Sequence, residues 1–296
     1  MRVLILGAAS MLGHKLYQQY QHRYDTWATV RTSYTPFARY KLFNPERLCG
    51  GVDAVDFPAV ERMLRSVRPD VIINCISSGK YTNDAADPLT SITVNALFPH
   101  QVANLSRELN ARFIQISTDN IFTGRKSIYS EDDPADATDL YGRTKLLGEV
   151  DGPDALTLRT AAIGRELNGG NGLVEWFLSN RPNSTVHGYR QSIYTGFTTV
   201  ALADVIADVI DNHPQLSGIY HVSSEPISKY ELLLRLRDAY APDIKVEPDD
   251  AVEVNRSLDS TRFRQATGFV PPTWKRMIEQ MAADPTSYDH WHQISA

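Results

Sequence analysis

The alternation of short apolar runs with amphipathic stretches most constrains how this chain can fold. Runs rich in Val, Ile and Leu occur at Val3–Leu6, Thr26–Val30, Val71–Ile76, Phe113–Ser117 and Ala155–Leu158. Stretches with helical periodicity lie between them, at Met11–Tyr20, Phe57–Val67 and Asn95–Leu109. The runs barely alternate between apolar and polar residues, as is typical of strands buried on both faces. Strands alternating with helices predict an α/β fold in which helices cover both faces of a parallel sheet.

The pattern changes after about residue 165. The run Asn168–Gly172 is typical of a loop, and helical periodicity returns at Val200–Ile210 and Lys229–Ala239. A strand is predicted at Ile219–Val222, and a last helix at Thr273–Met281. We expect residues 1–165 to form one domain and residues 166–296 to form mainly a smaller mixed α/β region. Some elements of that region are expected to return to the core, because no linker separates the two.

Composition narrows the possible functions. The chain has 296 residues, 42% of them hydrophobic and 22% charged, which is ordinary for a folded protein. With 30 Lys and Arg against 35 Asp and Glu, the net charge of −5 does not favour nucleic-acid binding. No stretch approaches the ~20 apolar residues of a membrane span, and the short run after Met1 indicates a strand, so we expect a cytoplasmic protein. Two cysteines and eight histidines without metal-ligand spacing predict no metal.

The loop Gly7–Gly13 follows the first strand and opens a helix. Gly7 lets the backbone approach a pyrophosphate, Gly13 lets helix and strand pack closely, and the helix N-terminus attracts the phosphates. Ser10 stands where the dinucleotide-binding pattern has its middle glycine, and its hydroxyl could add a phosphate contact. A tight turn without a ligand gives the same pattern, but the position at the start of a strand–helix–strand unit favours a Rossmann-type dinucleotide site.

The residues after the second and third strands bear on the choice of cofactor. Arg31 follows Gly13 by 18 residues, where an NAD site has a carboxylate and an NADP site an arginine for the 2′-phosphate. Arg31 therefore predicts NADP(H). Arg39 is either a second phosphate partner or a solvated side chain. Asp53 is either an acceptor for the adenine amino group or a turn residue.

Tyr141 and Lys145 stand four residues apart, so on a helix they face the same side. A nearby ammonium lowers the pKa of a phenol, which prepares the tyrosine for general acid or base catalysis. Thr118 ends an apolar strand 23 residues earlier, at the sheet edge where ligands of open α/β sheets bind. Its hydroxyl could bond a substrate carbonyl beside Tyr141, or merely cap the strand end.

These pieces together resemble the extended short-chain dehydrogenase/reductase family, and within it the dTDP-4-dehydrorhamnose reductases and related nucleotide-sugar 4-ketoreductases. The resemblance covers nearly the whole chain, and the block Ser117–Gly124 combined with Tyr141–Lys145 is its specific part. The other segments that carry it are Gly7–Gly13, Val71–Cys75, Tyr129–Asp133, Leu146–Glu149, Leu158–Thr160 and Ser257–Ser260.

The resemblance implies that Tyr141 is the proton donor, Lys145 its electrostatic partner and a ribose ligand, and Thr118 the hydroxyl that orients the substrate. Further implied cofactor contacts are Ser10, Met11 and Leu12 at the pyrophosphate, Asp53 and Ala54 at the adenine, and Cys75, Ile76, Ser77 and Thr160–Ala162 along the cofactor. Candidates for substrate contact are Ser77, Ser78, Lys80, Asp119, Asn120, Trp176, Arg190 and Arg256.

The chain departs from the family at three places. Asn120 stands where a tyrosine or cysteine is usual, and Gln191–Thr198 differs from the rhamnose enzymes' pattern. Lys15 stands where some members have a glutamate of a metal-bridged dimer. The sugar and base can therefore differ from the rhamnose enzymes. The family is often dimeric, so a homodimer is one expected assembly.

The resemblance implies NADPH-dependent reduction of the C4 keto group of a nucleotide-linked 4-keto-6-deoxyhexose, in deoxysugar biosynthesis. The C-terminal region would bind the nucleotide. One alternative is an epimerase or dehydratase, although such enzymes usually retain NAD, which Arg31 disfavours. A second is a non-catalytic, cofactor-binding regulatory subunit, against which the retention of Tyr141 and Lys145 argues.

Overall fold

A computed structural model describes residues 1–79, 87–168, 172–240 and 243–295. Its centre is a seven-stranded sheet with the strand order β11-β6-β5-β4-β1-β2-β3, in which every neighbouring pair is parallel. The strands are β1 (Arg2–Leu6), β2 (Asp25–Thr29), β3 (Leu48–Cys49), β4 (Val71–Asn74), β5 (Arg112–Ile116), β6 (Ala155–Arg159) and β11 (Gly218–His221). This order confirms the Rossmann-type, doubly wound fold.

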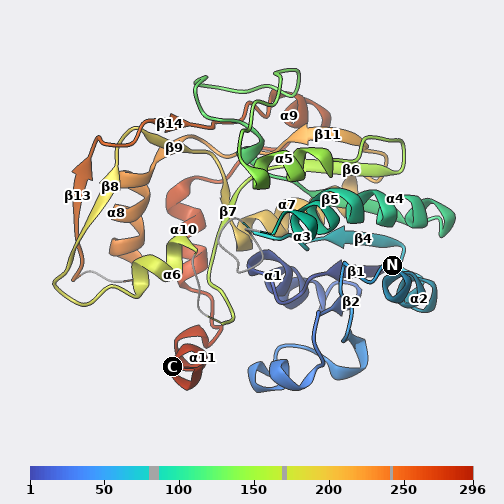
Figure 1. Ribbon diagram of the computed structural model, residues 1–296. Helices are drawn as coiled ribbons and strands as arrows, with labels where there is room; N and C mark the ends of the chain where they lie inside the picture. The colour runs from blue at the N-terminus through green and yellow to red at the C-terminus, as the bar shows by residue number, and fades with distance from the viewer. Residues whose placement is uncertain (80–86, 169–171, 241–242, 296) are drawn as a thin grey trace.

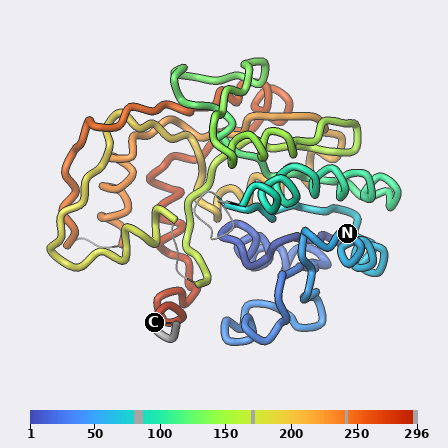
Figure 2. The backbone as a smooth tube through the Cα atoms, in the orientation of Figure 1, coloured from blue at the N-terminus to red at the C-terminus, as the bar shows by residue number. Residues whose placement is uncertain are grey.

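Each face of the sheet has its own apolar core, because successive side chains of a strand point to opposite faces. Val3 and Ile5 pack in one cluster with α1 (Met11–Tyr20) and α7 (Thr199–Asn212). Leu4 and Leu6 pack in the other with α2 (Phe57–Val67) and α4 (Phe98–Glu108). Figures 1 and 2 show these helices on the two sides of the sheet. Burial on both faces explains why the strands read as unbroken apolar runs.

The smaller region lies at one end of the sheet, on the left of Figure 1. Three short sheets pair β7 (Ala162–Ile163) with β10 (Phe197–Thr198), β9 (Ser192–Tyr194) with β12 (Ile227–Ser228) and β14 (Val254–Asn255), and β8 (Thr185–Tyr189) with β13 (Lys245–Asp249). Its helices are α6 (Leu173–Leu178), α8 (Lys229–Tyr240), α9 (Thr261–Thr267), α10 (Trp274–Ala282) and α11 (Tyr288–Ser295). Two later elements, α7 and β11, belong to the central layers.

The predicted helix at Asn95–Leu109 is longer than expected and contains an irregular turn. It begins at α3 (Pro88–Ile92), where the carboxylate of Asp87 accepts from two amides of the first turn. A π-helical turn at Thr93–Leu97 joins it to α4. Pro99 has no N–H to give to the carbonyl of Asn95, and the wider turn just before it accommodates this missing bond.

The expectation that the helix at Thr273–Met281 is the last one is wrong, because α11 follows it. Aromatic side chains hold α11 against earlier elements. Tyr288 hydrogen-bonds His14 of α1 at 2.8 Å, and the Trp291 ring lies edge-on to Tyr40, 4.9 Å between centroids. Tyr40 ends the short 3₁₀ helix η1 (Thr35–Tyr40), which a second one, η2 (Pro45–Arg47), follows.

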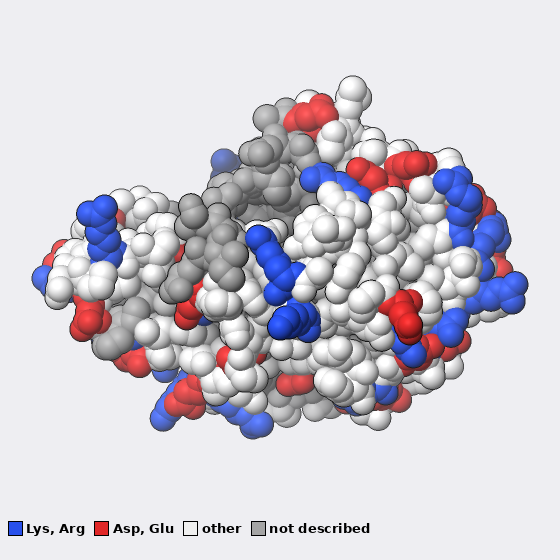
Figure 3. Space-filling model, turned by 90° about the horizontal axis from the view of Figure 1, so that it is seen from below, with Lys and Arg blue, Asp and Glu red and all other residues white. Residues whose placement is uncertain are grey.

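The outer surface carries charges of both signs. On the face seen in Figure 3, basic and acidic side chains are interspersed around the rim, and a small group of basic ones lies near the middle. Within the described ranges, no helix has the length and apolarity needed to cross a bilayer.

Candidate active site

The loop after β1 brings a strand end and a helix N-terminus into close contact. Gly7 has a φ of +83°, and a side chain there would come within 2.8 Å of Ile76 after β4. A Cβ at Gly13 would lie 2.2 Å from the Gly7 carbonyl oxygen. The Ser10 Oγ accepts from the Gly13 N–H at 3.0 Å and so caps α1. First-turn amides at the sheet edge are the arrangement that binds phosphates.

In the sheet, β2 is the neighbour of β1, and β3 lies beyond β2 at the edge. Arg31 is exposed just beyond β2, and Asp53 follows the buried Val52. The Asp53 Oδ1 accepts from the Val55 amide at 3.1 Å, so one carboxylate oxygen serves a turn. Ala54 is buried. Arg31, Asp53 and Ala54 remain predicted cofactor contacts.

Arg39, considered as a second phosphate partner, is engaged within the protein. Its guanidinium stacks on Tyr40 at 4.8 Å and donates to the Asn168 Oδ1 at 3.2 Å. These contacts tie η1 to the loop that precedes α6.

Helix α5 (Leu140–Leu147) places the predicted catalytic pair at the carboxyl edge of the sheet. Asp139 caps it by accepting from the Gly142 N–H at 2.7 Å. A Cβ at Gly142 would lie 2.4 Å from the Asn120 carbonyl oxygen, so only glycine allows α5 this close to the 3₁₀ turn η5 (Asp119–Ile121). Thr118 caps η5 through its hydroxyl, which accepts from the Asn120 amide at 3.1 Å.

Both Tyr141 and Lys145 have shifted pKa values, and that of Tyr141 differs from the one that the sequence predicts. The predicted low pKa of Tyr141 is wrong: burial raises the pKa to about 12, and the hydrogen bond with Thr118 only partly opposes this rise. Burial lowers the pKa of Lys145 to about 8. The Lys145 Nζ donates to the Ile116 carbonyl at 2.8 Å, which anchors it at the end of β5. At neutral pH the phenol therefore keeps its proton.

Asn95, in the π-helical turn, is a positioning residue that sequence reasoning missed. Its side-chain amide accepts from the Ser78 N–H at 2.8 Å and donates to the Ser78 carbonyl at 3.0 Å. The same amide donates to the Thr144 Oγ1 on α5 at 3.2 Å. Asn95 thus fixes the loop after β4 relative to the helix of Tyr141. The nearby Pro99, inside a helical pattern, was the available signal.

Two buried hydroxyls at the sheet edge have no hydrogen-bond partner among the described residues: the Ser78 Oγ after β4 and the Thr160 Oγ1 after β6. Cys75 directly follows β4, and burial raises the pKa of its thiol to about 12 while Lys145 partly opposes the rise. Ser77 is exposed in the same loop. Buried polar atoms without partners are rare, so Ser78 and Thr160 fit a polar ligand lying along this edge.

The substrate-side candidates Asp119, Asn120 and Arg256 lie together. The Asp119 Oδ1 accepts from the Asn120 Nδ2 at 2.9 Å and from the Thr118 hydroxyl at 3.3 Å. The Arg256 Nε donates to the Phe122 carbonyl at 2.7 Å. A polar pocket of about 240 Å³ opens here, lined by Asn120, Phe122, Thr123, Arg125, Ala137, Thr138, Asp139 and Arg256.

Two other candidates, Trp176 and Arg190, do not line this pocket. Trp176 lies on α6 with 43% of its surface exposed. Arg190 follows β8, forms an ion pair with Asp250 and lines a separate, more apolar pocket of about 440 Å³. Lys80 lies outside the described residues.

Several motif residues build a buried network behind the site instead of lining it. Glu149 forms a buried ion pair with Arg159 at 2.8 Å and accepts from the Ser117 hydroxyl at 2.6 Å. Arg159 also contacts the His221 ring at 3.3 Å. The network joins the ends of β5, β6 and β11 to the segment that follows α5.

Lys15 is buried on α1 and forms an ion pair with Asp284. Its ammonium also lies over the Tyr288 ring, 5.4 Å from the centroid. Lys15 thus fastens the C-terminal segment to α1. Over the parts of the chain that the structure describes, no cluster of three or more His, Cys, Asp or Glu side chains could hold a metal.

Comparison with known proteins agrees with this architecture. A family model described as the RmlD substrate binding domain matches residues 1–287. A dTDP-4-dehydrorhamnose reductase of Aggregatibacter actinomycetemcomitans is 25% identical over 309 residues, covering 95% of this chain and 98% of the relative. Methionine adenosyltransferase 2 subunit beta of Danio rerio is 28% identical over 251 residues, covering 81% of this chain and 74% of that protein.

A solved structure of dTDP-4-dehydrorhamnose reductase from Bacillus anthracis str. Ames in complex with NADP has the same fold. It is 22% identical, covers 96% of this chain and 99% of its own, and superposes with a TM-score of 0.78. The family match spans the sheet, the glycine loop and nearly all of the smaller region. The chain therefore belongs to the RmlD substrate-binding family, within the extended short-chain dehydrogenase/reductase group.

Proposed function

We propose that this chain is an NADPH-dependent reductase that converts the C4 keto group of a nucleotide-linked 4-keto-6-deoxyhexose into a hydroxyl. The observation that supports this proposal is that Thr118, Tyr141 and Lys145 lie at the carboxyl edge of the sheet, the edge at which the glycine loop follows β1. A keto reduction needs a group that still holds its proton at neutral pH, and the buried Tyr141 is such a group.

The residues at the sheet edge fit a nicotinamide dinucleotide. The positive φ of Gly7 and the open first turn of α1 suit a pyrophosphate, with Ser10, Met11 and Leu12 as amide donors. The buried hydroxyls of Ser78 and Thr160 have no hydrogen-bond partner among the described residues, so each can bond a polar ligand at that edge. Arg31 is the proposed 2′-phosphate partner and the reason to favour NADPH. When bound, NADPH supplies a hydride to the carbonyl carbon.

Tyr141 donates its phenolic proton to the oxygen of the former carbonyl, and Thr118 holds that oxygen in place by a hydrogen bond. Lys145, fixed by the Ile116 carbonyl, brings a positive charge that favours the tyrosinate left behind. Burial of Tyr141 and Lys145 keeps water away, which strengthens this charge interaction. With a pKa of about 8, Lys145 carries its charge over most of its population at pH 7.

We further propose that the two regions of the chain have different roles. Residues 1–165 bind NADP(H) and carry the proton donor, and residues 166–296 mainly bind the nucleotide-linked sugar. Asp119 and Asn120 contact the sugar, and no metal takes part. We propose a cytoplasmic location and a homodimer as the working assembly.

One relative favours a second candidate function. Methionine adenosyltransferase 2 subunit beta is, by its name, a subunit of a larger enzyme. A non-catalytic, cofactor-binding subunit remains the alternative on that ground, and an epimerase or dehydratase is the alternative within enzymes. Stoichiometric consumption of NADPH separates a reductase from both.

The test is a panel of 4-keto-6-deoxyhexoses linked to dTDP, UDP, GDP or CDP, with NADPH absorbance followed over time. Oxidation with one nucleotide supports the proposal and identifies the base. Tyr141→Phe should lower turnover by about 10²- to 10⁴-fold while NADPH binding persists. Tyr189→Phe, at a tyrosine 36% exposed on β8, is the matched control. NADPH binding without oxidation of any substrate would favour the regulatory alternative.

A further inference from the structure

The glycine loop and the C-terminal helix α11 meet at a buried histidine. His14, near the start of α1, is fully buried, and its two ring nitrogens contact different parts of the chain. The Nδ1 lies 2.8 Å from the Ser10 carbonyl oxygen, and the Nε2 lies 2.8 Å from the Tyr288 hydroxyl. A carbonyl only accepts hydrogen bonds, so the Nδ1 of the neutral ring carries the proton and donates. The Nε2 therefore accepts from the Tyr288 hydroxyl.

The Ser10 carbonyl sets the direction of an amide that the proposed cofactor needs. This carbonyl also accepts from the His14 backbone N–H at 3.1 Å, so two hydrogen bonds fix it. Because the peptide unit between Ser10 and Met11 is planar and trans, the Met11 N–H points opposite to the carbonyl. The Met11 N–H has no acceptor among the described residues and is a proposed pyrophosphate donor. The His14 ring thus helps to aim this amide.

Other contacts hold Tyr288 in place from both sides. The Gln18 Nε2 of α1 donates to the Thr286 Oγ1 at 2.6 Å, just before α11 begins. The Trp291 ring lies edge-on to Tyr288, 5.6 Å between centroids, and it also contacts Tyr40. Tyr40 belongs to η1, in the connection between β2 and β3. Helix α11 therefore contacts both connections that the proposed cofactor would touch, the one after β1 and the one after β2.

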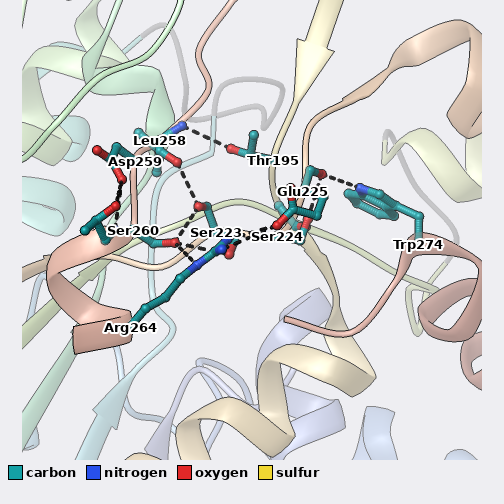
Figure 4. A network of polar contacts seen from close by, with 11 residues as sticks. Thr195, Ser223, Ser224, Glu225, Leu258, Asp259, Ser260, Arg264 and Trp274 are labelled. Carbon is teal, nitrogen blue, oxygen red and sulfur yellow. Dashed lines mark hydrogen bonds and ion pairs between the residues drawn. The ribbon is translucent and has the colours of Figure 1, made fainter. Parts of the chain in front are cut away.

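The helix before this segment, α10, is anchored in the smaller region. In Figure 4 the Trp274 Nε1, at the start of α10, donates to the Glu225 carbonyl, and the two atoms are 2.7 Å apart. The side chains of Met277 and Met281 are buried, and α10 packs on α7 and α8. A change at Tyr288 therefore alters the contact between α11 and α1 while α10 keeps its own anchors.

We infer that α11 positions the dinucleotide loop through Tyr288 and His14, so that docking of α11 on α1 and binding of NADP(H) stabilise each other. This inference rests on the proposed function for the identity of the ligand. Tyr288 and His14 are positioning residues, because they act through the peptide unit between Ser10 and Met11. Linkage requires one common factor: docked α11 tightens NADP(H) binding as much as bound NADP(H) favours the docked helix.

Calorimetric titration of the full-length protein with NADP⁺ measures one side of this linkage. In Tyr288→Phe the Kd should rise about 2- to 10-fold, the effect of losing one hydrogen bond. Tyr24→Phe is the matched control and should bind like wild type, because it removes a hydrogen bond of equal length, 2.8 Å to the Asp211 Oδ1, beyond the C-terminal end of α1. In a His14→Leu background, Tyr288→Phe should have no further effect, since the connection through the ring is already lost.

A smaller probe separates positioning of the loop from a general loss of structure. Adenosine 2′-monophosphate has the adenine and the 2′-phosphate of NADP⁺ but no pyrophosphate, so its Kd should be equal for wild type and Tyr288→Phe. Hydrogen exchange of the wild-type protein, followed by mass spectrometry, measures the other side of the linkage. NADP⁺ should slow amide exchange in residues 285–292 by a factor similar to the change in Kd, and adenosine 2′-monophosphate should not slow it.

The outcomes distinguish this inference from the cofactor proposal. Equal NADP⁺ Kd values for wild type, Tyr288→Phe and Tyr24→Phe would overturn the inference and leave the cofactor proposal standing, as would an equally large loss for adenosine 2′-monophosphate. Should Tyr288→Phe fold poorly, exchange in residues 285–292 of wild type that NADP⁺ leaves unchanged would also overturn it. Absence of NADP⁺ binding to wild type would refute the cofactor proposal and the inference together.

Discussion

Lys145→Met should make the protein more stable while it removes the proposed activity. Lys145 is held in the folded state with a pKa of about 8, against 10.5 for an ordinary lysine, and burial is the main cause. At about 1.4 kcal/mol for each tenfold change in acidity, holding the charged form in the folded state costs about 3 kcal/mol. Methionine fills a similar volume without a charge, but it leaves the Ile116 carbonyl without its donor, a loss of about 1 kcal/mol. The expected net gain is about 2 kcal/mol at pH 7.

The lowered pKa of Lys145 also predicts how the stability difference between Lys145→Met and wild type changes with pH. The folded-state pKa of Lys145 lies below the unfolded-state value, so the penalty is complete below about pH 8 and disappears as the pH rises toward 10.5. The stability difference between Lys145→Met and wild type should therefore shrink to near zero by about pH 10. Other groups that titrate in this range are common to both proteins and cancel in the difference.

Urea denaturation followed by tryptophan fluorescence measures the stability difference between Lys145→Met and wild type at pH 7 and at pH 10. Lys275→Met, at a lysine whose side chain is 75% exposed, should show no difference at either pH. A Lys145→Met protein that is less stable than wild type at pH 7, or a gain that does not depend on pH, would refute the reasoning.

Three further substitutions test the supports of the site. Gly148→Ala should lower the free energy of unfolding by about 3 kcal/mol, because its Cβ would lie 1.8 Å from the Asn95 carbonyl oxygen; an unchanged urea midpoint would contradict this. Glu149→Gln should cost about 3 kcal/mol, since the buried Arg159 loses its counter-charge; thermal unfolding measures it, and a loss under 1 kcal/mol argues against the ion pair. Burial lowers the pKa of His14 to about 4, so wild type should lose stability as the pH falls from 6.5 to 4. His14→Gln should flatten that loss, and parallel pH profiles for the two proteins would count against it.

The central sheet could be predicted from the sequence because its physical signals are local. Strands buried on both faces must be apolar throughout, and each of the five predicted runs overlaps a strand of the structure. The very short β3 (Leu48–Cys49) has too few residues to show a pattern. The start of the helix at Pro88 was missed because its first turns contain no sustained periodicity, although Asp87 and Pro88 form an ordinary helix start.

The site was predictable only in part, for a similar reason. Thr118, Tyr141 and Lys145 stand in short motifs of this sequence, and the sheet edge brings them together. The contacts of Asn95 with Ser78 and Thr144 were missed, since they join segments that lie far apart in the sequence. The pKa of Tyr141 was misjudged because charge alone was considered, whereas burial dominates it.

The motif residues and the proposed substrate contact Arg256 lie in different parts of the chain. Some motif residues do not line the site. Glu149 and Arg159 form a buried ion pair that joins the ends of neighbouring strands to the segment after α5. Their replacement is therefore expected to disturb the helix that carries Tyr141. Arg256, a proposed substrate contact, comes from the smaller region and is held by a short sheet and by its hydrogen bond to the Phe122 carbonyl. A change confined to the loops of the smaller region is therefore expected to alter the proposed substrate preference while the proposed proton donor stays in place.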